Sequence, residues 1–232
     1  MLKERILTLL RGGLPDKLPF AHCDRHLPRG EVERWARNRG LSLLCHRPCY
    51  AESMTDVEIM TRTEGDILTR TYNTPVGSLT ERLKTGAGYG QAGYGRDWKG
   101  MQPRRVEYAV KKPEDFRVLE FIVENTHYKP YYYPIEDQLR RLGGDGIVVA
   151  QMPYSPFQRL LIDWVGPRLY IHLAKEEEAI NEICAVLQER YEKELFPAAA
   201  ESPSEVVLYG DNIDSILVSP RIFGRYHMPS YA

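Results

Sequence analysis

The stretch that decides the fold is Gly146-Ile147-Val148-Val149-Ala150, followed by Gln151-Met152-Pro153-Tyr154-Ser155-Pro156. Its first five residues are apolar, and three of them are β-branched. An uninterrupted run of this kind indicates a strand that is buried on both faces of a parallel sheet. The proline-containing turn leads into a helical pattern over residues 155–164. A buried strand followed by a turn and a helix is the building unit of an α/β fold.

Similar units flank this stretch on both sides. The other expected strands are 18–22, 41–45 and 205–209, and the other expected helices are 2–11, 30–38, 113–123, 135–142, 176–195 and 219–226. Because strands and helices alternate in the N-terminal part and in the C-terminal third, we expect βα units around a parallel sheet.

The segment between residues 50 and 110 has a different pattern. Residues 55–83 alternate and are rich in Thr, Val and Ile, with turn signals at Gly65-Asp66 and Asn73-Thr74-Pro75. This pattern predicts antiparallel hairpins, with 105–110 as a returning strand. Residues 85–100 hold six glycines and predict a long loop. The Gly86–Gly90 motif lacks the Lys-Ser/Thr pair of a phosphate-binding loop, so we favour a mobile loop between strands, which is compatible with a lid over a nearby site.

The length limits the architecture. A (β/α)₈ barrel takes about 250 residues, or about 31 for each unit. About 80 residues, from about 50 to 130, are mostly not βα in pattern, and the remaining ~150 supply about five such units; the β-rich excursion itself is at 50–110. We therefore predict an α/β fold, a partial TIM (β/α)₈-type barrel that forms a single domain over 1–232 and is incomplete at its C-terminal end.

Composition narrows the class of protein further. Of 232 residues, 43% are hydrophobic, and 31 basic residues balance 32 acidic ones, so we expect no nucleic-acid partner. The run Ile147–Ala150 is far shorter than the ~18 apolar residues that span a bilayer, so we expect no membrane partner. Four cysteines without framework spacing fit a reducing cytoplasm. An unclosed barrel exposes a sheet edge, so we expect a homo-oligomer.

Polar residues follow three of the expected strands. Asp24-Arg25-His26 follows the first, Tyr154 follows the strand at 146–150, and Asp211-Asn212 follows the strand at 205–209. Carboxyl ends of barrel strands face the active site, so we expect these groups to meet at one rim. Asp211 stands where a general acid or base would be placed. Arg25 suits a carboxylate or phosphate. For each group the alternative is a structural role in a loop or turn.

Two short clusters contain metal-ligating atoms. They are His22-Cys23-Asp24-Arg25-His26 and Cys45-His46-Arg47-Pro48-Cys49. Their spacing matches no standard zinc site, and Cys45 lies in an apolar run. We therefore favour buried cysteines that pack as small apolar side chains, and assign no metal ligand.

Several motifs occur in an order that resembles the uroporphyrinogen decarboxylase superfamily. They are Lys3-Glu4-Arg5-Ile6-Leu7, Pro15-Asp16-Lys17-Leu18-Pro19-Phe20, Thr74-Pro75-Val76-Gly77-Ser78-Leu79, Lys111-Lys112-Pro113-Glu114-Asp115-Phe116, Val218-Ser219-Pro220-Arg221-Ile222-Phe223 and Tyr226-His227-Met228-Pro229. The later motifs are similar to the methyltransferase-like branch. This resemblance implies corrinoid-dependent methyl transfer to a thiol, with a small molecule or a corrinoid protein as the partner.

The resemblance also implies roles for residues. Asp211, Asn212 and Tyr154 would form the catalytic group, and Asp24, Arg25, His26 and Arg159 would bind substrate; Arg159 stands where the superfamily is expected to have a tyrosine. Zinc and a corrinoid are the implied cofactors, with the zinc ligands expected beyond Ala232. The alternatives are uroporphyrinogen decarboxylation in porphyrin biosynthesis and a non-catalytic corrinoid-binding or partner-binding barrel. Only Arg25-His26-Leu27-Pro28 remains of the decarboxylase's arginine-rich signature, which disfavours the first alternative.

Overall fold

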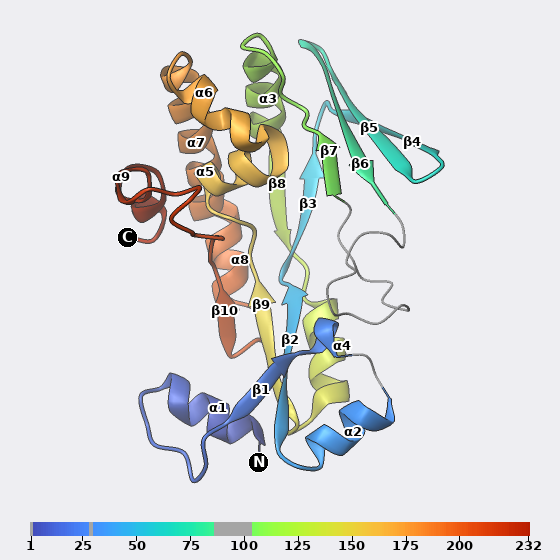
Figure 1. The fold of residues 1–232 in the computed structure, drawn as a ribbon, viewed down its shortest axis with the longest axis vertical. Coiled ribbons are helices and arrows are strands. Elements are labelled where there is room, and N and C mark those ends of the chain that lie inside the picture. Colours follow the sequence, from blue (N-terminus) through green and yellow to red (C-terminus); the bar gives the residue numbers. More distant parts are fainter. Residues whose placement is uncertain (1, 28–29, 86–103) are drawn as a thin grey trace.

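The structure, a computed structural model, describes residues 2–27, 30–85 and 104–232. A four-stranded parallel sheet occupies one half of an elongated molecule, and an antiparallel sheet and most of the helices occupy the other half (Figure 1). This confirms the mixed α/β class. The glycine-rich motif Gly86–Gly90 lies outside the described residues.

The parallel sheet is built from the strands that the sequence predicts. Its members in spatial order are β1 (Phe20–Cys23), β2 (Leu41–Pro48), β9 (Gly146–Gln151) and β10 (Val206–Leu208). Each pairs with its neighbour in the parallel direction. All four carboxyl ends therefore point the same way. Among the described residues this sheet is open, with β1 and β10 at its edges.

The two faces of the sheet are covered differently. Leu43, Cys45, Val148 and Ala150 point into the main core, and α4 (Tyr133–Leu142) packs on that side. On the other face, α1 (Leu2–Leu10) packs its Ile6 and Leu7 against Ile147 and Val149. Further along that second face, His46 is half-buried and Pro48 is exposed, so the cover of this face decreases toward the carboxyl end of β2.

The β-rich excursion forms two antiparallel ladders. As predicted, a meander contains β4 (Glu58–Glu64), β5 (Ile67–Thr74), β6 (Gly77–Lys84) and β7 (Arg104–Glu107). A second, unexpected ladder pairs β3 (Tyr50–Met54) with β8 (Thr126–Pro130). The sequence of β3, Tyr50-Ala51-Glu52-Ser53-Met54, does not alternate between apolar and polar residues, so it lacks the pattern that identifies a half-buried strand. In the structure, no residue of β3 is fully buried.

The helix α2 (Glu31–Arg37) packs on β2, in the half that holds the parallel sheet. The other helices complete the second half of the molecule: α3 (Asp115–Glu124), α5 (Pro156–Arg159), α6 (Leu169–Leu173), α7 (Glu177–Arg190), α8 (Phe196–Ala200) and α9 (Pro220–Ile222). Wider π-helical turns follow α5, α7 and α9, at Leu160–Trp164, Tyr191–Leu195 and Phe223–His227. Within the described part of the chain, every helix is too short or too polar to cross a bilayer.

Replacing Gly146 tests the central pairing of the sheet. A Cβ atom at this position would lie 2.0 Å from the carbonyl oxygen of Leu43, a backbone atom of β2 that cannot move aside. We expect Gly146→Ala to lower the free energy of unfolding by about 3 kcal/mol, measured by urea denaturation. Gly224→Ala is the control, because no atom lies within 4 Å of the added methyl group. Equal stability of the two variants would contradict this packing.

Candidate functional site

The carboxyl ends of the parallel strands lie at two levels. The last residues of β9 and β10, Gln151 and Leu208, are in register. Cys23, the last residue of β1, is level with Leu44 and thus with Ile147, four residues before Gln151. At 3.3 Å per residue, the end of β1 is set back by about 13 Å. The structure therefore brings Tyr154 and Asp211 together, and Asp24 belongs to a separate group.

The turns after β9 and β10 meet at the carboxylate of Asp211. Its Oδ1 accepts a hydrogen bond from the backbone N–H of Ser155 at 2.9 Å, and its Oδ2 accepts one from the Ser155 hydroxyl. The same Oδ2 lies 2.8 Å from Nδ1 of His227. The side chains of Asp211 and His227 are fully buried, and so is Ser155. We call Ser155, Asp211 and His227 the Asp211 cluster.

The hydrogen bonds of this cluster keep Asp211 ionised. Burial acts to raise the pKa of its carboxyl group, but the hydrogen bonds from His227 and Ser155 outweigh this effect and hold the pKa below its ordinary value. The cluster is not arranged as a hydrolase triad. The imidazole nitrogen Nδ1 faces both the carboxylate and the serine hydroxyl, which lies 3.4 Å away. In a triad the base would face its nucleophile through Nε2.

Two polar side chains lie beside the Asp211 cluster and closer to solvent. The amide Nδ2 of Asn212 donates to the hydroxyl of Tyr154 at 3.2 Å. Asn212 is exposed and Tyr154 is half-buried. These two side chains, the Tyr154–Asn212 pair, come from adjacent strand ends and offer a phenol and an amide to a ligand. Of the three predicted catalytic residues, Tyr154 and Asn212 can be reached from solvent, whereas the side chain of Asp211 is fully buried.

The second group lies at the end of β1 and the last residues of β2. Asp24 accepts a hydrogen bond from Arg47 at 2.7 Å, and Arg47 also donates to Gln138 at 2.6 Å. Asp24 therefore forms an ion pair with Arg47. His26 packs edge-on against His22, with ring centroids 6.1 Å apart.

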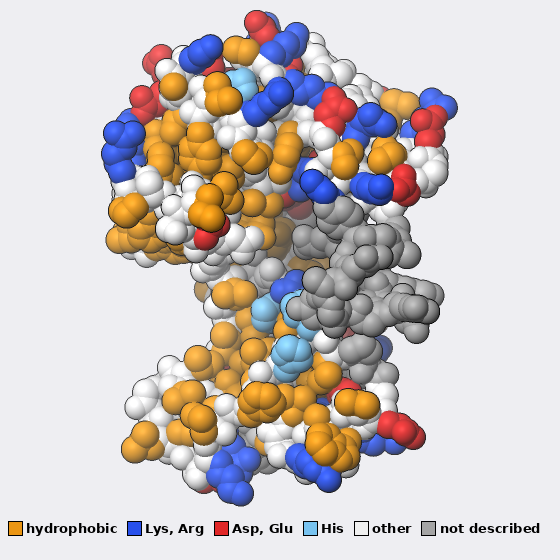
Figure 2. Space-filling view, in the orientation of Figure 1, with side chains coloured by type: hydrophobic (Ala, Val, Ile, Leu, Met, Phe, Trp, Pro, Cys, Tyr) orange, Lys and Arg blue, Asp and Glu red, His pale blue; other side chains and the backbone are white. Residues whose placement is uncertain are grey.

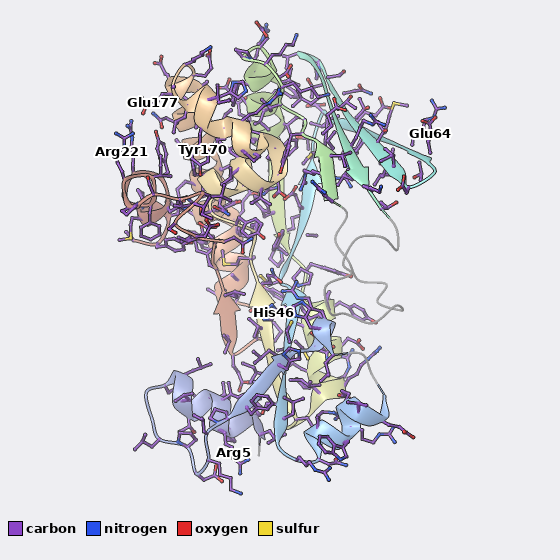
Figure 3. All side chains as sticks on the ribbon, in the orientation of Figure 1. Arg5, His46, Glu64, Tyr170, Glu177 and Arg221 are labelled. Carbon is purple, nitrogen blue, oxygen red and sulfur yellow. The ribbon has the colours of Figure 1, made fainter. Side chains whose placement is uncertain are left out.

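Arg25 is placed differently from Arg47. In the described part of the chain its guanidinium contacts Sγ of Cys23 at 3.3 Å and Nδ1 of His46 at 3.2 Å, and neither partner is a carboxylate. Burial lowers the pKa of His46, and the charge of Arg25 lowers it further, so this imidazole is neutral at pH 7. Figure 2 shows histidine side chains at the narrow middle of the molecule, where Figure 3 labels His46.

Arg159, a predicted substrate ligand, is deeply embedded. Its side chain pairs with Glu52 Oε2 at 2.6 Å and donates to the hydroxyls of Tyr128 and Tyr191. Only 7% of Arg159 is exposed. These contacts join α5 to the β3–β8 ladder and to the π-helical turn after α7, and they occupy the guanidinium that a substrate would need.

The remaining candidates have no site around them. Cys45 and Cys49 are buried in the core, as the apolar interpretation expects. No group of three or more His, Cys, Asp or Glu within residues 2–27, 30–85 and 104–232 is suited to hold a metal ion. A pocket of about 410 Å³ is lined by α6, α7 and α9, including Tyr170, Glu177 and Arg221, at a distance from His46 (Figure 3).

The partners of the predicted residues do not follow from local sequence patterns. Ser155 and His227 contact Asp211, and Glu52, the partner of Arg159, lies in β3, a strand that the sequence does not predict. A serine before a proline is typical of a helix cap, but the Ser155 hydroxyl donates to Asp211 and makes no capping hydrogen bond, so the local pattern does not predict its partner. Only the folded chain shows that His227 contacts Asp211.

Comparisons of the chain with protein-family models, with curated proteins and with solved structures found no match.

The buried carboxylate can be tested by Asp211→Asn. The variant loses hydrogen bonds to a charged acceptor, so we expect a loss of about 2–3 kcal/mol in unfolding free energy at pH 7. Because the folded-state pKa of Asp211 is lowered, its contribution is complete above the unfolded pKa of about 3.9 and is lost as the pH falls through the folded value. Urea denaturation of both proteins should show the stability difference shrinking below about pH 4. A difference independent of pH would contradict an ionised Asp211. The exposed Asp66→Asn serves as the control.

Arg159→Met separates a structural from a substrate-binding role. Removing the guanidinium leaves Glu52 and two tyrosine hydroxyls without their donor. We expect a loss of about 3 kcal/mol, at the low end for a broken buried pair because Glu52 keeps 27% side-chain exposure. The exposed Arg62→Met should change stability by less than about 0.5 kcal/mol. Unchanged stability of Arg159→Met in thermal and urea unfolding would instead favour a residue reserved for substrate.

Proposed function

We propose that this chain is a partial (β/α)-barrel protein of the uroporphyrinogen decarboxylase superfamily that transfers a methyl group from a methylated corrinoid to a thiol. The observation that carries the proposal is the Tyr154–Asn212 pair. These side chains follow adjacent parallel strands and are linked at 3.2 Å at the sheet edge where barrel enzymes bind substrate. The ordered sequence motifs supply the reaction class.

In this reaction the thiol sulfur attacks the methyl carbon. An S–C bond forms, the Co–C bond breaks with its electron pair remaining on cobalt, and the thiol proton is released. The described residues do not fit a zinc site, because they contain no suitable group of three ligands. We therefore assign no metal-dependent step to them. Their proposed task is to bind and orient the thiol substrate and the corrinoid donor.

Arg25 favours a thiol that carries an anionic group. Its guanidinium has a neutral imidazole and a cysteine as neighbours in the described residues, so it keeps its positive charge for a ligand. The planar fork of arginine matches a carboxylate, sulfonate or phosphate. His46 adds a hydrogen-bonding group without adding charge. The Tyr154–Asn212 pair, which lies at the separate ends of β9 and β10, would then orient the face of the corrinoid donor.

Decarboxylation of a porphyrinogen is less well supported. That reaction needs several free arginines for substrate carboxylates and an accessible acid beside the pyrrole. Arg47 and Arg159 are paired with Asp24 and Glu52, and Asp211 is fully buried. Uroporphyrinogen turnover is therefore included as an outcome of the test, as is corrinoid binding without turnover.

The test uses the full natural polypeptide with methylcobalamin and two thiols, one carrying a sulfonate and one uncharged. We expect loss of the methylcobalamin absorbance and formation of the methyl thioether, detected by mass spectrometry. Arg25→Gln should lower kcat/KM for the anionic thiol about tenfold, the effect of losing about 1.4 kcal/mol of binding energy, and should affect the uncharged thiol less. Arg62→Gln, on the distant β4 strand, is the matched control and should match the wild type.

Three outcomes would overturn the proposal. The first is a wild-type protein that catalyses no thiol-dependent demethylation. The second is decarboxylation of uroporphyrinogen, which would establish the alternative reaction. The third is a cobalamin spectral titration that shows binding while no thioether forms, which would identify a binding protein.

A further inference from the structure

The buried Asp211 cluster joins three segments that are far apart in the sequence: the turn after β9, the turn after β10 and the π-helical turn Phe223–His227. We infer that His227 is a positioning residue that fixes Asp211 and thereby holds the Tyr154–Asn212 pair in the geometry needed by a substrate. This inference rests on the proposed function, because it assigns a role in that same site.

The donor and acceptor roles in the cluster follow from the chemistry of the groups. An ionised carboxylate only accepts hydrogen bonds, so Nδ1 of His227 must carry the hydrogen that is shared with Oδ2 of Asp211. The other ring nitrogen, Nε2, is buried and has no partner within the described residues. Within the described residues, the polar contacts of the imidazole are therefore both made through Nδ1, with Oδ2 of Asp211 and with the adjacent Ser155 hydroxyl.

Packing fixes the orientation of the imidazole ring. His227 lies edge-on to Phe157 of α5, with ring centroids 5.4 Å apart, and stacks on Phe223 at 5.9 Å. No part of His227 is exposed to solvent. Rotation of the ring away from Asp211 would disturb both aromatic contacts. The π-helical turn is thus joined to the substrate-facing turns through one oriented N–H group.

Asp211, which His227 holds in place, in turn fixes the backbone next to the Tyr154–Asn212 pair. Its Oδ1 holds the N–H of Ser155, the residue that directly follows Tyr154. The carbonyl of Tyr154 accepts a hydrogen bond from Tyr191 at 3.1 Å. On the other strand end, the carbonyl of Asn212 accepts one from Gln158 at 3.2 Å. Both backbones are therefore held by hydrogen bonds, in addition to the 3.2 Å hydrogen bond between the amide of Asn212 and the phenol of Tyr154.

A pair of substitutions separates positioning from packing. In His227→Asn the amide NH₂ occupies the place of Nδ1 and keeps the donor to Asp211. In His227→Gln the amide lies one bond further out, where Nε2 stood, and the donor to Asp211 is lost. Both variants replace an aromatic ring by an amide, so a loss of aromatic packing affects them alike.

Two readouts are measured on the full-length proteins. Hydrogen exchange at the Ser155 amide, which needs no activity, should be about tenfold faster in His227→Gln and close to wild type in His227→Asn. The amide of Ile122, buried in α3, reports global unfolding and should exchange alike in both variants. Methyl transfer by His227→Gln should show a kcat about tenfold lower with a smaller change in KM, and His227→Asn should restore it.

The outcomes distinguish the two proposals. Equal exchange at Ser155 in the two variants, or acceleration at Ser155 and Ile122 together, would overturn a positioning role for His227. Selective acceleration at Ser155 in His227→Gln supports that role even when the wild type transfers no methyl group, a result that would overturn the proposed function alone.

Discussion

The parallel pairing of β2 with β9 is the constraint on which the rest of the structure depends. This ladder runs from Leu43 opposite Gly146 to Pro48 opposite Gln151, and it lies at the centre of the four-stranded sheet. The absence of a side chain at Gly146 lets the two backbones approach closely at the start of the ladder. Once β9 is in place, β10 pairs with its last residues and the turns after both strands meet. The meeting of these two turns places Ser155 beside Asp211 and so forms part of the Asp211 cluster.

Several charged side chains in the interior have partners of opposite charge or hydrogen-bonding groups. A buried charge is costly unless it is paired and hydrogen-bonded, and Asp211, Glu81 and Arg159 each have such partners. Charged groups that have found partners stabilise the fold and are poor candidates for binding a ligand. Arg25 and the Tyr154–Asn212 pair, which are held in place but remain accessible, are therefore better candidates than the more deeply buried Asp211 and Arg159.

The sequence allowed prediction of the elements whose residues repeat regularly and face a core. The parallel strands, the meander at β4–β7 and the longer helices fall within a few residues of their expected positions. The β3–β8 ladder could not be predicted, because Tyr50–Met54 is largely exposed and lacks an apolar period. At the site, the position of Tyr154 and Asp211 after adjacent strands was predictable from the direction of the sheet. The stagger of Asp24 and the contact of Asp211 with His227 depend on strand register and tertiary packing, which local patterns do not encode.

The widened turn at Phe223–His227 has a consequence for how this protein tolerates insertions and deletions. Successive residues of an α-helix are rotated by about 100°, so one extra residue in a turn changes the rotational phase of everything that follows it. The imidazole of His227 reaches Asp211 only when the π-helical turn gives His227 this rotational position. Loss of a single residue between Ser219 and His227 would turn the ring toward another side of the helix, although the composition of the segment would hardly change. Divergence in this segment should therefore proceed through substitutions that preserve its length.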